Sequence, residues 1–325
     1  MIKIESNSSK NLLAFSAGID STALFFILLN NNIPFDIAIV DYNIREQSKQ
    51  EVLYAQELAK KYNKKCHLKE VTLESTSNFE KNAREIRYSF FEELIKENSY
   101  QTLFTAHQLN DKLEWFLMQL SKGAGLPEIL GLNKEEKRAL YTLKRPLLDI
   151  SKDELKEFLI QNNISYFIDQ SNYDKKYRRN LFREEFSNNF LLKYKEGVKN
   201  SFEYLQNDLD SLNIEQTPIY YKEELVIYKA LKDDNINIRI IDKAVKKLGF
   251  LISSQTRKEI LEKREVVISH KLSVSITANH IWISPYLTST MNKDFKELCR
   301  VNKIPKNSRA YLSTLENYSE IIKSL

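Results

Sequence analysis

Cysteine, glycine and proline are all scarce in this sequence of 325 residues. Its two cysteines, Cys66 and Cys299, are far apart and form no CxxC pair, which argues against a disulfide scaffold, a zinc ribbon and an iron–sulfur site. No apolar run approaches the roughly 20 residues that a membrane-spanning helix needs. The first ten residues also lack the basic and apolar regions of a secretory signal. We therefore expect a cytoplasmic protein with two free thiols and no contact with a membrane.

A strong excess of one charge sign is also missing. There are 49 Lys and Arg residues against 44 Asp and Glu residues, and the formal net charge is +5. Such a mild excess attracts a large polyanion only where the basic residues are clustered. The hydrophobic share of 42% and the charged share of 29% are ordinary for a soluble globular protein. The length predicts two or three compact domains.

Short apolar runs alternate with amphipathic stretches in the first part of the chain. The amphipathic stretches carry apolar residues three and four positions apart, which is typical of helices that cover a sheet. This alternation predicts a parallel α/β sheet, in which ligands bind at the carboxyl ends of the strands. The predicted strands are Leu12–Phe15, Phe35–Asp41, Cys66–Val71 and Leu103–Ala106, and the predicted helices are Thr22–Asn30, Ser48–Tyr62, Asn78–Asn98 and Asp111–Leu120.

The pattern changes after Pro146. Ser151 precedes a stretch with acidic residues in its first turn, so it is the predicted N-cap of a helix that ends at Asn162. The run Arg179–Leu212 is mostly helical, and we place a domain boundary near residue 215, where the helical signal breaks. The last third mixes predicted helices at Ile236–Leu248 and Gln255–Lys263 with alternating runs at Val266–Ile276 and Ala278–Ile283.

The segment Ser16-Ala17-Gly18-Ile19-Asp20-Ser21 joins the first predicted strand to the first predicted helix. Its small residues let backbone N–H groups close around phosphate oxygens, the two serine hydroxyls add hydrogen bonds, and the helix N-terminus favours an anion. Asp20 fits such a site if Mg²⁺ bridges its carboxylate to the phosphates. On loop composition alone, an ordinary turn between strand and helix explains the segment about equally well.

The loop resembles the SGGxDS signature of PP-loop ATP pyrophosphatases, and the motifs after it resemble the tRNA(Ile)-lysidine synthetase family of that class. That family attaches lysine to the wobble cytidine of an isoleucine tRNA. Ala17 stands where the signature has glycine. We expect a negative φ at Ala17, which would make this replacement harmless, because a positive φ is strained in a residue with a Cβ atom.

Polar residues after the second predicted strand continue the resemblance. Val40-Asp41-Tyr42-Asn43-Ile44-Arg45 is similar to the family's VDHxLR stretch, with Tyr42 in place of His. We expect Asp41 and Arg45 to be exposed at the strand end, and the resemblance implies a catalytic role for Asp41. In the alternative interpretation Asp41 only begins a turn. Ser48 is the predicted N-cap of the next helix in either case.

A basic helix is predicted after the third strand. Residues 78–88 resemble the family's NxExxARxxRY motif, in which Arg84 and Tyr88 lie one turn apart on a shared face. Arginines near the strand ends suit phosphate or carboxylate binding. The resemblance makes Arg84 a candidate tRNA contact, and a solvated, ion-paired helix face is the alternative.

An acidic helix is predicted after the fourth strand. Residues 105–115 resemble the family's TAHHxDDxxET motif and supply His107 and Asp111. His107 is expected at the active edge of the sheet, and Asp111 lies one turn before Glu114 on the helix. Asn110 replaces the first Asp of the motif, so Mg²⁺ binding would depend on the remaining carboxylates.

Two glycines and a basic run complete the resemblance. Lys122-Gly123-Ala124-Gly125 is similar to the family's [RK]G[ST]G loop, and Arg145-Pro146-Leu147-Leu148 to its RPLL run. Lys122 is the predicted contact of the α-phosphate, although a lysine at a helix C-terminus also suits the helix dipole. Residues 169–183 resemble DxSNxxxxxxRNxxR, and their basic and aromatic side chains suit phosphate contact and base stacking.

The motifs occur in family order over about residues 11–190, which is far more specific than any single motif. The resemblance implies an α/β fold with a parallel-sheet PP-loop domain, adenine nucleotide alpha hydrolase-like, at residues 1–150. A mainly helical tRNA-contacting extension at 151–215 and a smaller α+β C-terminal domain at 216–325, expected to recognise tRNA, would follow. The implied residues are, for catalysis, Asp41, His107, Asp111, Lys122 and Arg179; for ATP, Ser16, Ala17, Gly18, Ile19, Asp20 and Ser21; for metal, Asp20 and Asp111; and for tRNA, Arg84, Arg178, Arg179, Asn180 and Arg183.

The implied reaction uses ATP and Mg²⁺ on an isoleucine tRNA with a CAU anticodon. ATP adenylates the ring carbonyl oxygen of the wobble cytidine, and the amine of L-lysine then displaces AMP. No obligate protein partner is evident. One alternative is a PP-loop tRNA thiolase, which the arrangement of the two cysteines does not support. The other is a non-catalytic tRNA-binding relative, which Ala17 and Asn110 make conceivable.

Overall fold

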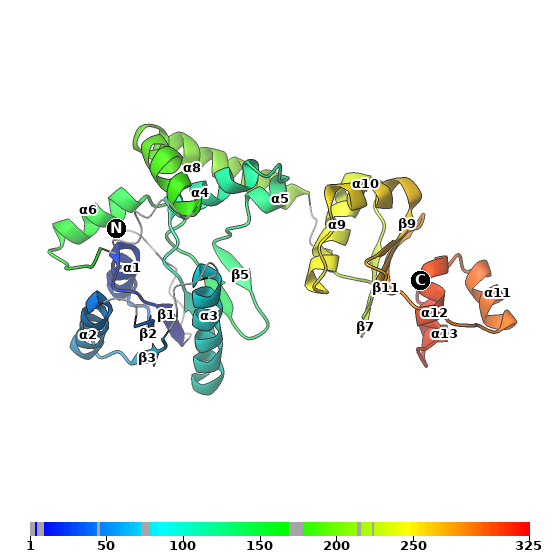
Figure 1. The fold of residues 1–325 in the computed structure, drawn as a ribbon, viewed down its shortest axis with the longest axis horizontal. Coiled ribbons are helices and arrows are strands. Elements are labelled where there is room, and N and C mark those ends of the chain that lie inside the picture. Colours follow the sequence, from blue (N-terminus) through cyan, green and yellow to red (C-terminus); the bar gives the residue numbers. More distant parts are fainter. Residues whose placement is uncertain are drawn as a thin grey trace. The chain divides into compact units, whose positions relative to one another are not determined.

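The computed structural model describes residues 4, 10–43, 46–72, 79–168, 178–212, 216–222 and 224–325. The chain divides into two compact units, Met1–Asn207 and Asp208–Leu325 (Figure 1). The first unit is built on a mostly parallel sheet and the second on an antiparallel one. Among the described residues, no helix is both long and apolar enough to cross a membrane.

The sheet of the first unit has six strands in the order β3-β2-β1-β4-β6-β5. Neighbouring strands are parallel except for β5, which runs antiparallel to β6 at the edge. In the register, Leu13 of β1 pairs with Ile37 of β2 on one side and with Phe104 of β4 on the other. The strands are β1 (Asn11–Ala14), β2 (Phe35–Asp41), β3 (Cys66–Glu70), β4 (Thr102–Phe104), β5 (Glu135–Lys137) and β6 (Thr142–Lys144).

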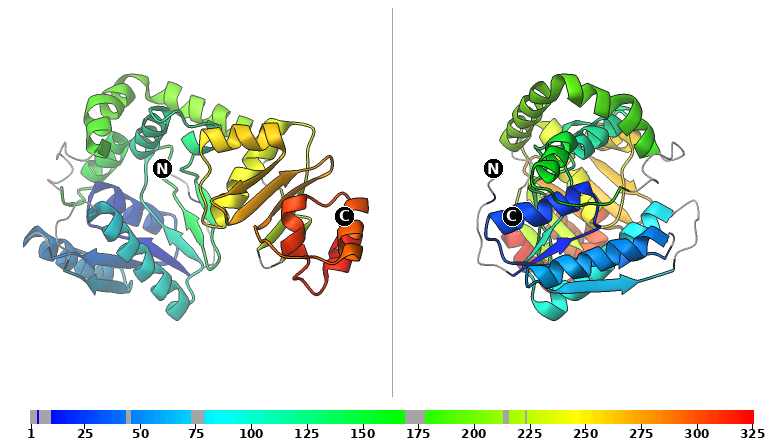
Figure 2. Two further views of the ribbon diagram at one scale, coloured as in Figure 1. Left: turned by 45° about the vertical axis from the view of Figure 1, so that its right-hand side comes forward. Right: turned by 90° about the vertical axis from the view of Figure 1, so that its left-hand side faces the viewer.

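Helices cover both faces of this sheet because successive strand residues point to opposite sides. Leu13 and Ile37 pack into a core with α1 (Ile19–Asn30), α2 (Glu46–Lys61) and α6 (Lys152–Gln161). On the other face, Leu12 and Ala38 pack into a second core with residues of α3 (Phe79–Asn98). Figure 2 shows this helix beside the strands. The carboxyl end of β1 leads into α1, and the carboxyl end of β4 leads into α4 (Leu109–Leu120).

A helical layer follows the sheet. It consists of α5 (Leu126–Ile129), α7 (Arg178–Phe182), a π-helix η2 (Arg183–Ser187) and α8 (Asn188–Ser211). In α8 the backbone of Tyr194 departs from helical geometry, so the helix is kinked there. Ser151 caps α6, accepting a hydrogen bond from the Glu154 N–H at 3.4 Å, which confirms the predicted N-cap.

The second unit is a five-stranded antiparallel sheet in the order β7-β8-β11-β10-β9 with a helical layer on each face. Val226 and Ile283 pack under α9 and α10, whereas Ile227 and Trp282 pack under α11, α12 and α13. The strands are β7 (Tyr220–Lys222), β8 (Leu225–Lys229), β9 (Glu265–Ile268), β10 (Leu272–Ile276) and β11 (His280–Pro285), and the helices are α9 (Asp234–Lys247), α10 (Ser254–Lys263), α11 (Lys293–Val301), α12 (Lys306–Leu312) and α13 (Tyr318–Lys323).

The predicted fold class is confirmed, with one antiparallel edge strand that the sequence did not indicate. The four predicted strands and the helices between them are all present within a few residues of their predicted ends. One local detail was wrong: α2 begins at Glu46, so Ser48 lies inside its first turn and is not the N-cap. The boundary between the two compact units falls between residues 207 and 208. The predicted division into a catalytic domain, a helical extension and a C-terminal domain at residues 150 and 215 stays a prediction.

Candidate active site

The loop Ser16–Ser21 is folded back on itself between β1 and α1. The Ser21 hydroxyl accepts a hydrogen bond from the Ser16 N–H at 3.2 Å and lies 3.1 Å from the Ser16 hydroxyl. Gly18 is the N-cap residue of α1, and no side chain caps the helix. Because the first N–H groups of a helix lack partners within it, the uncapped end of α1 is open to an anion.

Ala17 has a φ of +57°, which corrects the expectation of a negative value. The residue is fully buried, and its carbonyl oxygen accepts a hydrogen bond from the Phe167 N–H at 2.9 Å. Gly18 forms a parallel bridge with the same Phe167. Contact with a segment 150 positions later therefore holds the loop in a left-handed conformation that disfavours Ala by about 1 kcal/mol or more. The replacement of glycine is strained rather than harmless.

Asp20 is partly buried, and one of its two carboxylate oxygens is fully buried. Its Oδ1 atom accepts no hydrogen bond from any residue that the structure describes. Burial, and then the charge of Asp111, raise the pKa of Asp20 to about 7, against the opposing effect of Lys152 and Arg183. A carboxylate in this state gains strongly from a cation, since a positive charge both pairs with it and lowers its pKa.

Two carboxylates of α4 and two arginines from α7 and η2 form a buried ionic cluster beside Asp20. Glu114 is fully buried and accepts from Arg179 Nε at 3.0 Å and from Arg183 Nε at 2.8 Å. Asp111 accepts from Arg179 Nη2 at 2.6 Å and from the Gln108 N–H at 3.0 Å. Burial disfavours the ionised form of Asp111 and so raises its pKa, but the positive charge of Arg179 holds the pKa of Asp111 below its usual range. The cluster ties α4 to a segment about 70 positions later.

His107 lies at the end of β4, as predicted, and it is neutral. Burial is the main reason that its pKa is lowered to about 4. The charge of Asp111 raises this pKa, whereas the charges of Arg145, Arg179 and Arg84 lower it further. Its Nδ1 atom is 3.0 Å from the Thr105 hydroxyl. The imidazole can therefore offer a hydrogen bond near neutral pH without carrying a charge.

Asn110 takes no part in the ion pairs and hydrogen bonds described above for this cluster and has partners of its own. Its side-chain nitrogen donates to Asn188 Oδ1 at 3.0 Å, and its oxygen accepts from the Lys152 N–H at 3.1 Å. The side chain is buried and joins the start of α4 to α6 and α8. Asn110 thus uses its side chain to hold α4 against its neighbours, a contact that needs both an amide donor and an amide acceptor.

Asp41 is buried, which corrects the expectation that it is exposed at the strand end. Its Oδ1 atom accepts a hydrogen bond from the Asn43 N–H at 2.8 Å, the geometry of a local turn. Tyr42 donates to the Ala83 carbonyl oxygen at 2.9 Å and so joins this turn to α3. The contacts favour the alternative in which Asp41 begins a turn, and its catalytic role stays a prediction.

Arg84 lies on an exposed face of α3, stacked on Tyr88. Its guanidinium carbon is 4.7 Å from the centre of the Tyr88 ring, which confirms that the two residues share a face. Arg138, which carried no signal in the sequence, lies 5.0 Å from the same ring. Since Arg84 also acts on the pKa of His107, its charge reaches the site.

The remaining predicted residues fall into three groups. Asn180 is buried in α7 beside Arg179. Lys122 follows the far end of α4 and is exposed; eleven residues at 1.5 Å each separate it from Asp111 by roughly 16 Å along the helix. The structure thus does not bring Lys122 together with the cluster. The side chain of Arg178, together with Ile44, Arg45, Asn78 and the motif residues 169–177, lies outside the described residues.

Glu114 and Lys152 are the site residues with no role predicted from the sequence. The spacing of three between Asp111 and Glu114 was the available signal, because it places both carboxylates on one face of a helix. Lys152 gave no such signal, since α6 and the start of α4 meet only through tertiary packing around Asn110.

A family model described as the PP-loop domain matches residues 2–190, more than half of the chain. A tRNA(Ile)-lysidine synthase of Campylobacter jejuni is 46% identical to the chain over 304 residues, which are 93% of this chain and 92% of that protein. The chain belongs to the tRNA(Ile)-lysidine synthase family. It is therefore an ATP-dependent ligase.

Further comparisons agree with this assignment. The tRNA(Ile)-lysidine synthase of Helicobacter pylori is 41% identical over 97% of this chain and 91% of its own, and that of Wolinella succinogenes is 41% identical over 93% and 92%. The U34-tRNA thiolase NcsA from Methanococcus maripaludis has a similar fold, with a TM-score of 0.54, 18% identity, and coverage of 77% of this chain and 84% of the thiolase. At that identity the likeness concerns the fold alone.

Proposed function

We propose that the protein joins L-lysine to the wobble cytidine of an isoleucine tRNA with a CAU anticodon, forming lysidine. ATP adenylates the ring carbonyl oxygen of the cytidine and pyrophosphate leaves; the lysine amine then attacks the same ring carbon and AMP departs. The observation that carries the proposal is the convergence of the phosphate loop, Asp20, whose buried Oδ1 atom has no hydrogen-bond donor among the described residues, and the Asp111–Arg179 pair at the ends of β1 and β4. Family membership over nine-tenths of the chain supports it.

In this proposal the loop and α1 hold the departing pyrophosphate. The uncapped N-terminus of α1 supplies N–H donors and a favourable dipole, and the Ser16 and Ser21 hydroxyls add hydrogen bonds. Arg179 is 42% exposed at its side chain, so it can reach a phosphate while it remains paired with Asp111. Positioning and neutralisation of charge then account for most of the acceleration.

The residues present fit a bound Mg²⁺. The buried Oδ1 atom of Asp20 has no described donor, and Asp111 is near enough to raise the pKa of Asp20. We propose that these two carboxylates hold the ion, which would bridge to phosphate oxygens and offset their charge. Neutral His107 would hydrogen-bond to the nucleotide or the cytidine from the carboxyl end of the neighbouring strand β4.

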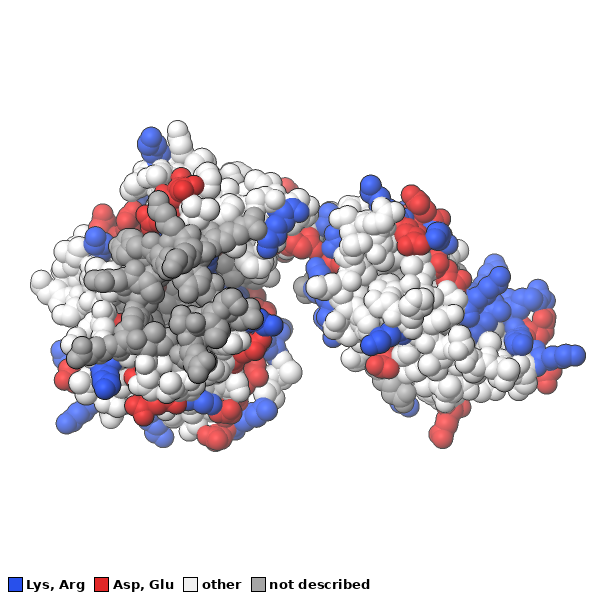
Figure 3. All heavy atoms as spheres, in the orientation of Figure 1, with Lys and Arg blue, Asp and Glu red and all other residues white. Residues whose placement is uncertain are grey.

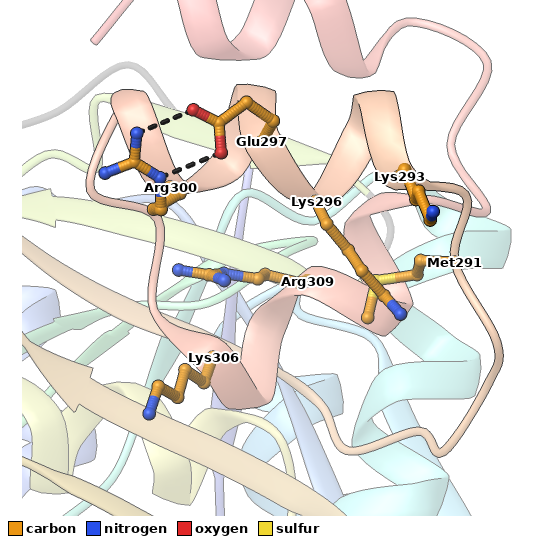
Figure 4. Close-up of a pocket in the computed structure, with 7 residues that line it drawn as sticks. All are labelled: Met291, Lys293, Lys296, Glu297, Arg300, Lys306 and Arg309. Atoms are coloured by element: carbon orange, nitrogen blue, oxygen red, sulfur yellow. Dashed lines mark hydrogen bonds and ion pairs between the residues drawn. The ribbon is translucent and has the colours of Figure 1, made fainter.

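We further propose that the second unit contacts tRNA through a basic pocket on α11 and α12. The pocket has a volume of about 370 Å³ and is shown in Figure 4. Glu297 is its only acidic lining residue, and it is paired with Arg300 at 2.6 Å. Lys and Arg side chains gather on this part of the unit in Figure 3. The basic lining residues are Lys293, Lys296, Arg300, Lys306 and Arg309.

The stability of the fold does not explain this clustering. Lys293 is the first residue of α11, where the helix dipole disfavours a positive charge. Lys296 and Arg300 follow at spacings of three and four, so like charges are neighbours on one helix face. A cluster that opposes helix stability is expected where an anionic ligand compensates for it.

The decisive test incubates the protein with ATP, labelled lysine and the CAU isoleucine tRNA. Transfer of label to the RNA supports lysidine formation. ATP-dependent adenylation without transfer would point to another modification, such as thiolation. That alternative has little chemical support, because burial raises the pKa of Cys66 to about 11 and also raises that of Cys299, so neither is a ready thiolate. Binding without either reaction would indicate a non-catalytic relative.

The basic pocket has its own test, in which Lys293, Lys296 and Lys306 are changed to Ala together. Each lost phosphate contact lowers the slope of log affinity against log salt by roughly 0.7 to 0.9, so we expect a fall of about 2. The matched control changes Lys232, Lys247 and Lys258, exposed lysines in or beside the α9 and α10 layer, to Ala. Equal slopes for the two triple variants would overturn the proposal.

A further inference from the structure

Three aromatic side chains of the helical layer are exposed at four-residue spacing. Phe186 is 49% exposed, Phe190 48% and Tyr194 57%, and we refer to these three residues as the aromatic stripe. The rings of Phe190 and Tyr194 lie 5.1 Å apart, and Phe186 lies 5.5 Å from Phe182 in the same way. Aromatic surface of this extent on one helical run is more than the isolated exposed residues common on proteins.

The stripe differs in burial from the rest of the helix. Leu191, Val198 and Phe202 are the buried residues of α8, and Val198 and Phe202 continue the four-residue spacing beyond the kink at Tyr194, whereas the three rings before it are exposed. Leu192 is also exposed, at 71%, but it lies two residues from Phe190 and so points to the opposite side. Packing within the first unit therefore accounts for the buried residues and not for the stripe.

The stripe begins next to the ionic cluster. Arg183, whose guanidinium binds Glu114, belongs to the same π-helix as Phe186 and precedes it by three residues. From Phe186 to Tyr194 the helix rises by about 12 Å. A ligand whose reacting group lies at Asp20 and Arg179 can thus continue along the stripe without leaving the first unit.

The charge around the stripe suits a nucleic acid. Between Glu185 and Glu196 the sequence has no acidic residue and two lysines. Lys193 is exposed and follows Phe190 by three positions, so it flanks the stripe on the helix surface. Rings accept nucleobases on their faces, and a neighbouring lysine pairs with the backbone phosphate.

We infer that the aromatic stripe stacks unpaired nucleobases of the anticodon loop next to the wobble cytidine. The inference rests on the proposed function. It adds that the protein recognises the flat, unpaired bases of a single RNA strand, and that it binds them mainly by stacking rather than by charge. An RNA duplex offers no exposed base faces, so it would not use the stripe. A protein partner or a second copy of this chain would use the same rings as an apolar contact, and the experiment separates these cases.

The experiment measures binding of a fluorescent stem-loop RNA with a CAU loop to the full-length protein. Phe190→Ala and Tyr194→Ala are each expected to weaken binding by about 5- to 100-fold, the usual range for loss of one stacked base. Phe190→Trp and Tyr194→Phe keep a ring and should bind within about twofold. Leu192→Ala is the matched control, because it removes an exposed apolar side chain from the opposite side of the same helix.

Three readouts decide the outcome. The salt dependence of binding should be the same for the Ala variants and the wild type, because stacking releases few counterions. Affinity for a fully paired RNA should not change. Unchanged stem-loop affinity in both Ala variants overturns the inference, as does sedimentation showing that the wild type dimerises through the stripe and the variants do not. Lysine transfer by the wild type is scored separately, so its absence would count against the proposed function and not against the stripe.

Discussion

Replacement of Asp20 by Asn should stabilise the protein while it removes activity. Asp20 is partly buried near Asp111, with a fully buried Oδ1 atom, and its pKa in the folded protein is raised from an ordinary value of 3.8 to about 7. Because the folded state disfavours the charged form, ionisation of Asp20 lowers the free energy of unfolding. The Asn side chain has nearly the same shape and carries no charge, so it avoids this penalty.

The magnitude follows from the two ionisation constants. A tenfold difference is worth about 1.4 kcal/mol, so the full penalty above pH 7 is about 4 kcal/mol. Partial solvent access to the loop reduces it, and we expect a gain of about 2 to 4 kcal/mol for Asp20→Asn at pH 8. For a carboxyl with a raised pKa, stability is fully present below the unfolded value and is lost as pH rises to the folded value. The advantage of the variant should therefore shrink towards pH 4.

The assay is urea unfolding of both proteins in the presence of a chelator, at pH values from 4.5 to 8.5. In a second series, added Mg²⁺ should stabilise the wild type and leave the stability of Asp20→Asn unchanged. The difference in free energy of unfolding between the two proteins should therefore become smaller. Asp208→Asn, the same substitution at an exposed position of α8, controls for the loss of one negative charge. If Asp20→Asn is no more stable than the wild type at pH 8, the assignment of Asp20 as an uncompensated buried carboxylate is wrong.

Three other changes have definite expected outcomes. Glu114→Gln leaves the guanidinium groups of Arg183, 14% exposed, and Arg179, 42% exposed, undercompensated and should lower the urea-derived free energy of unfolding by about 2 to 4 kcal/mol; a loss below about 1 kcal/mol would show that the cluster adds little. Ala17→Gly relieves a positive φ and should raise the melting temperature, by an amount equivalent to up to about 1 kcal/mol, and a lower melting temperature would contradict the strain. His107 should titrate near pH 4 in an NMR experiment, and since its folded pKa lies below the unfolded value, its contribution to stability should be lost as pH falls from about 6.5 to 4. A His107 midpoint above pH 6 would refute its burial as a neutral ring.

Elements with strong periodicity were predictable from the sequence, and elements made by tertiary pairing were not. The four parallel strands are apolar runs, so composition alone marks them. β5 and β6 are three-residue strands of mostly charged or polar sequence, EEK and TLK, whose pairing with each other and with β4 defines them. Such short strands at and next to the sheet edge carry little of the hydrophobic signal that prediction needs.

Within the site, residue types were more predictable than their environments. The motif spacings brought Asp20, His107, Asp111 and Arg179 together correctly. The conformation of Ala17 depends on the hydrogen bond from Phe167, and no local pattern encodes a contact 150 positions away. The burial of Asp41 was not predicted, because the side chain of a residue at a strand end can face either the solvent or the protein interior. Such contacts distant in sequence decide environments, and one sequence alone does not reveal them.

The ionic cluster joins segments that are made at different times during synthesis of the chain. The strands and helices that form the sheet core are complete once Gln161 has been made, whereas Arg179 and Arg183 are added later. Until then Asp111 and Glu114 are two carboxylates without their arginines, so the start of α4 cannot settle into its final burial. We therefore expect the sheet scaffold of the first unit to pack before the ionic cluster forms.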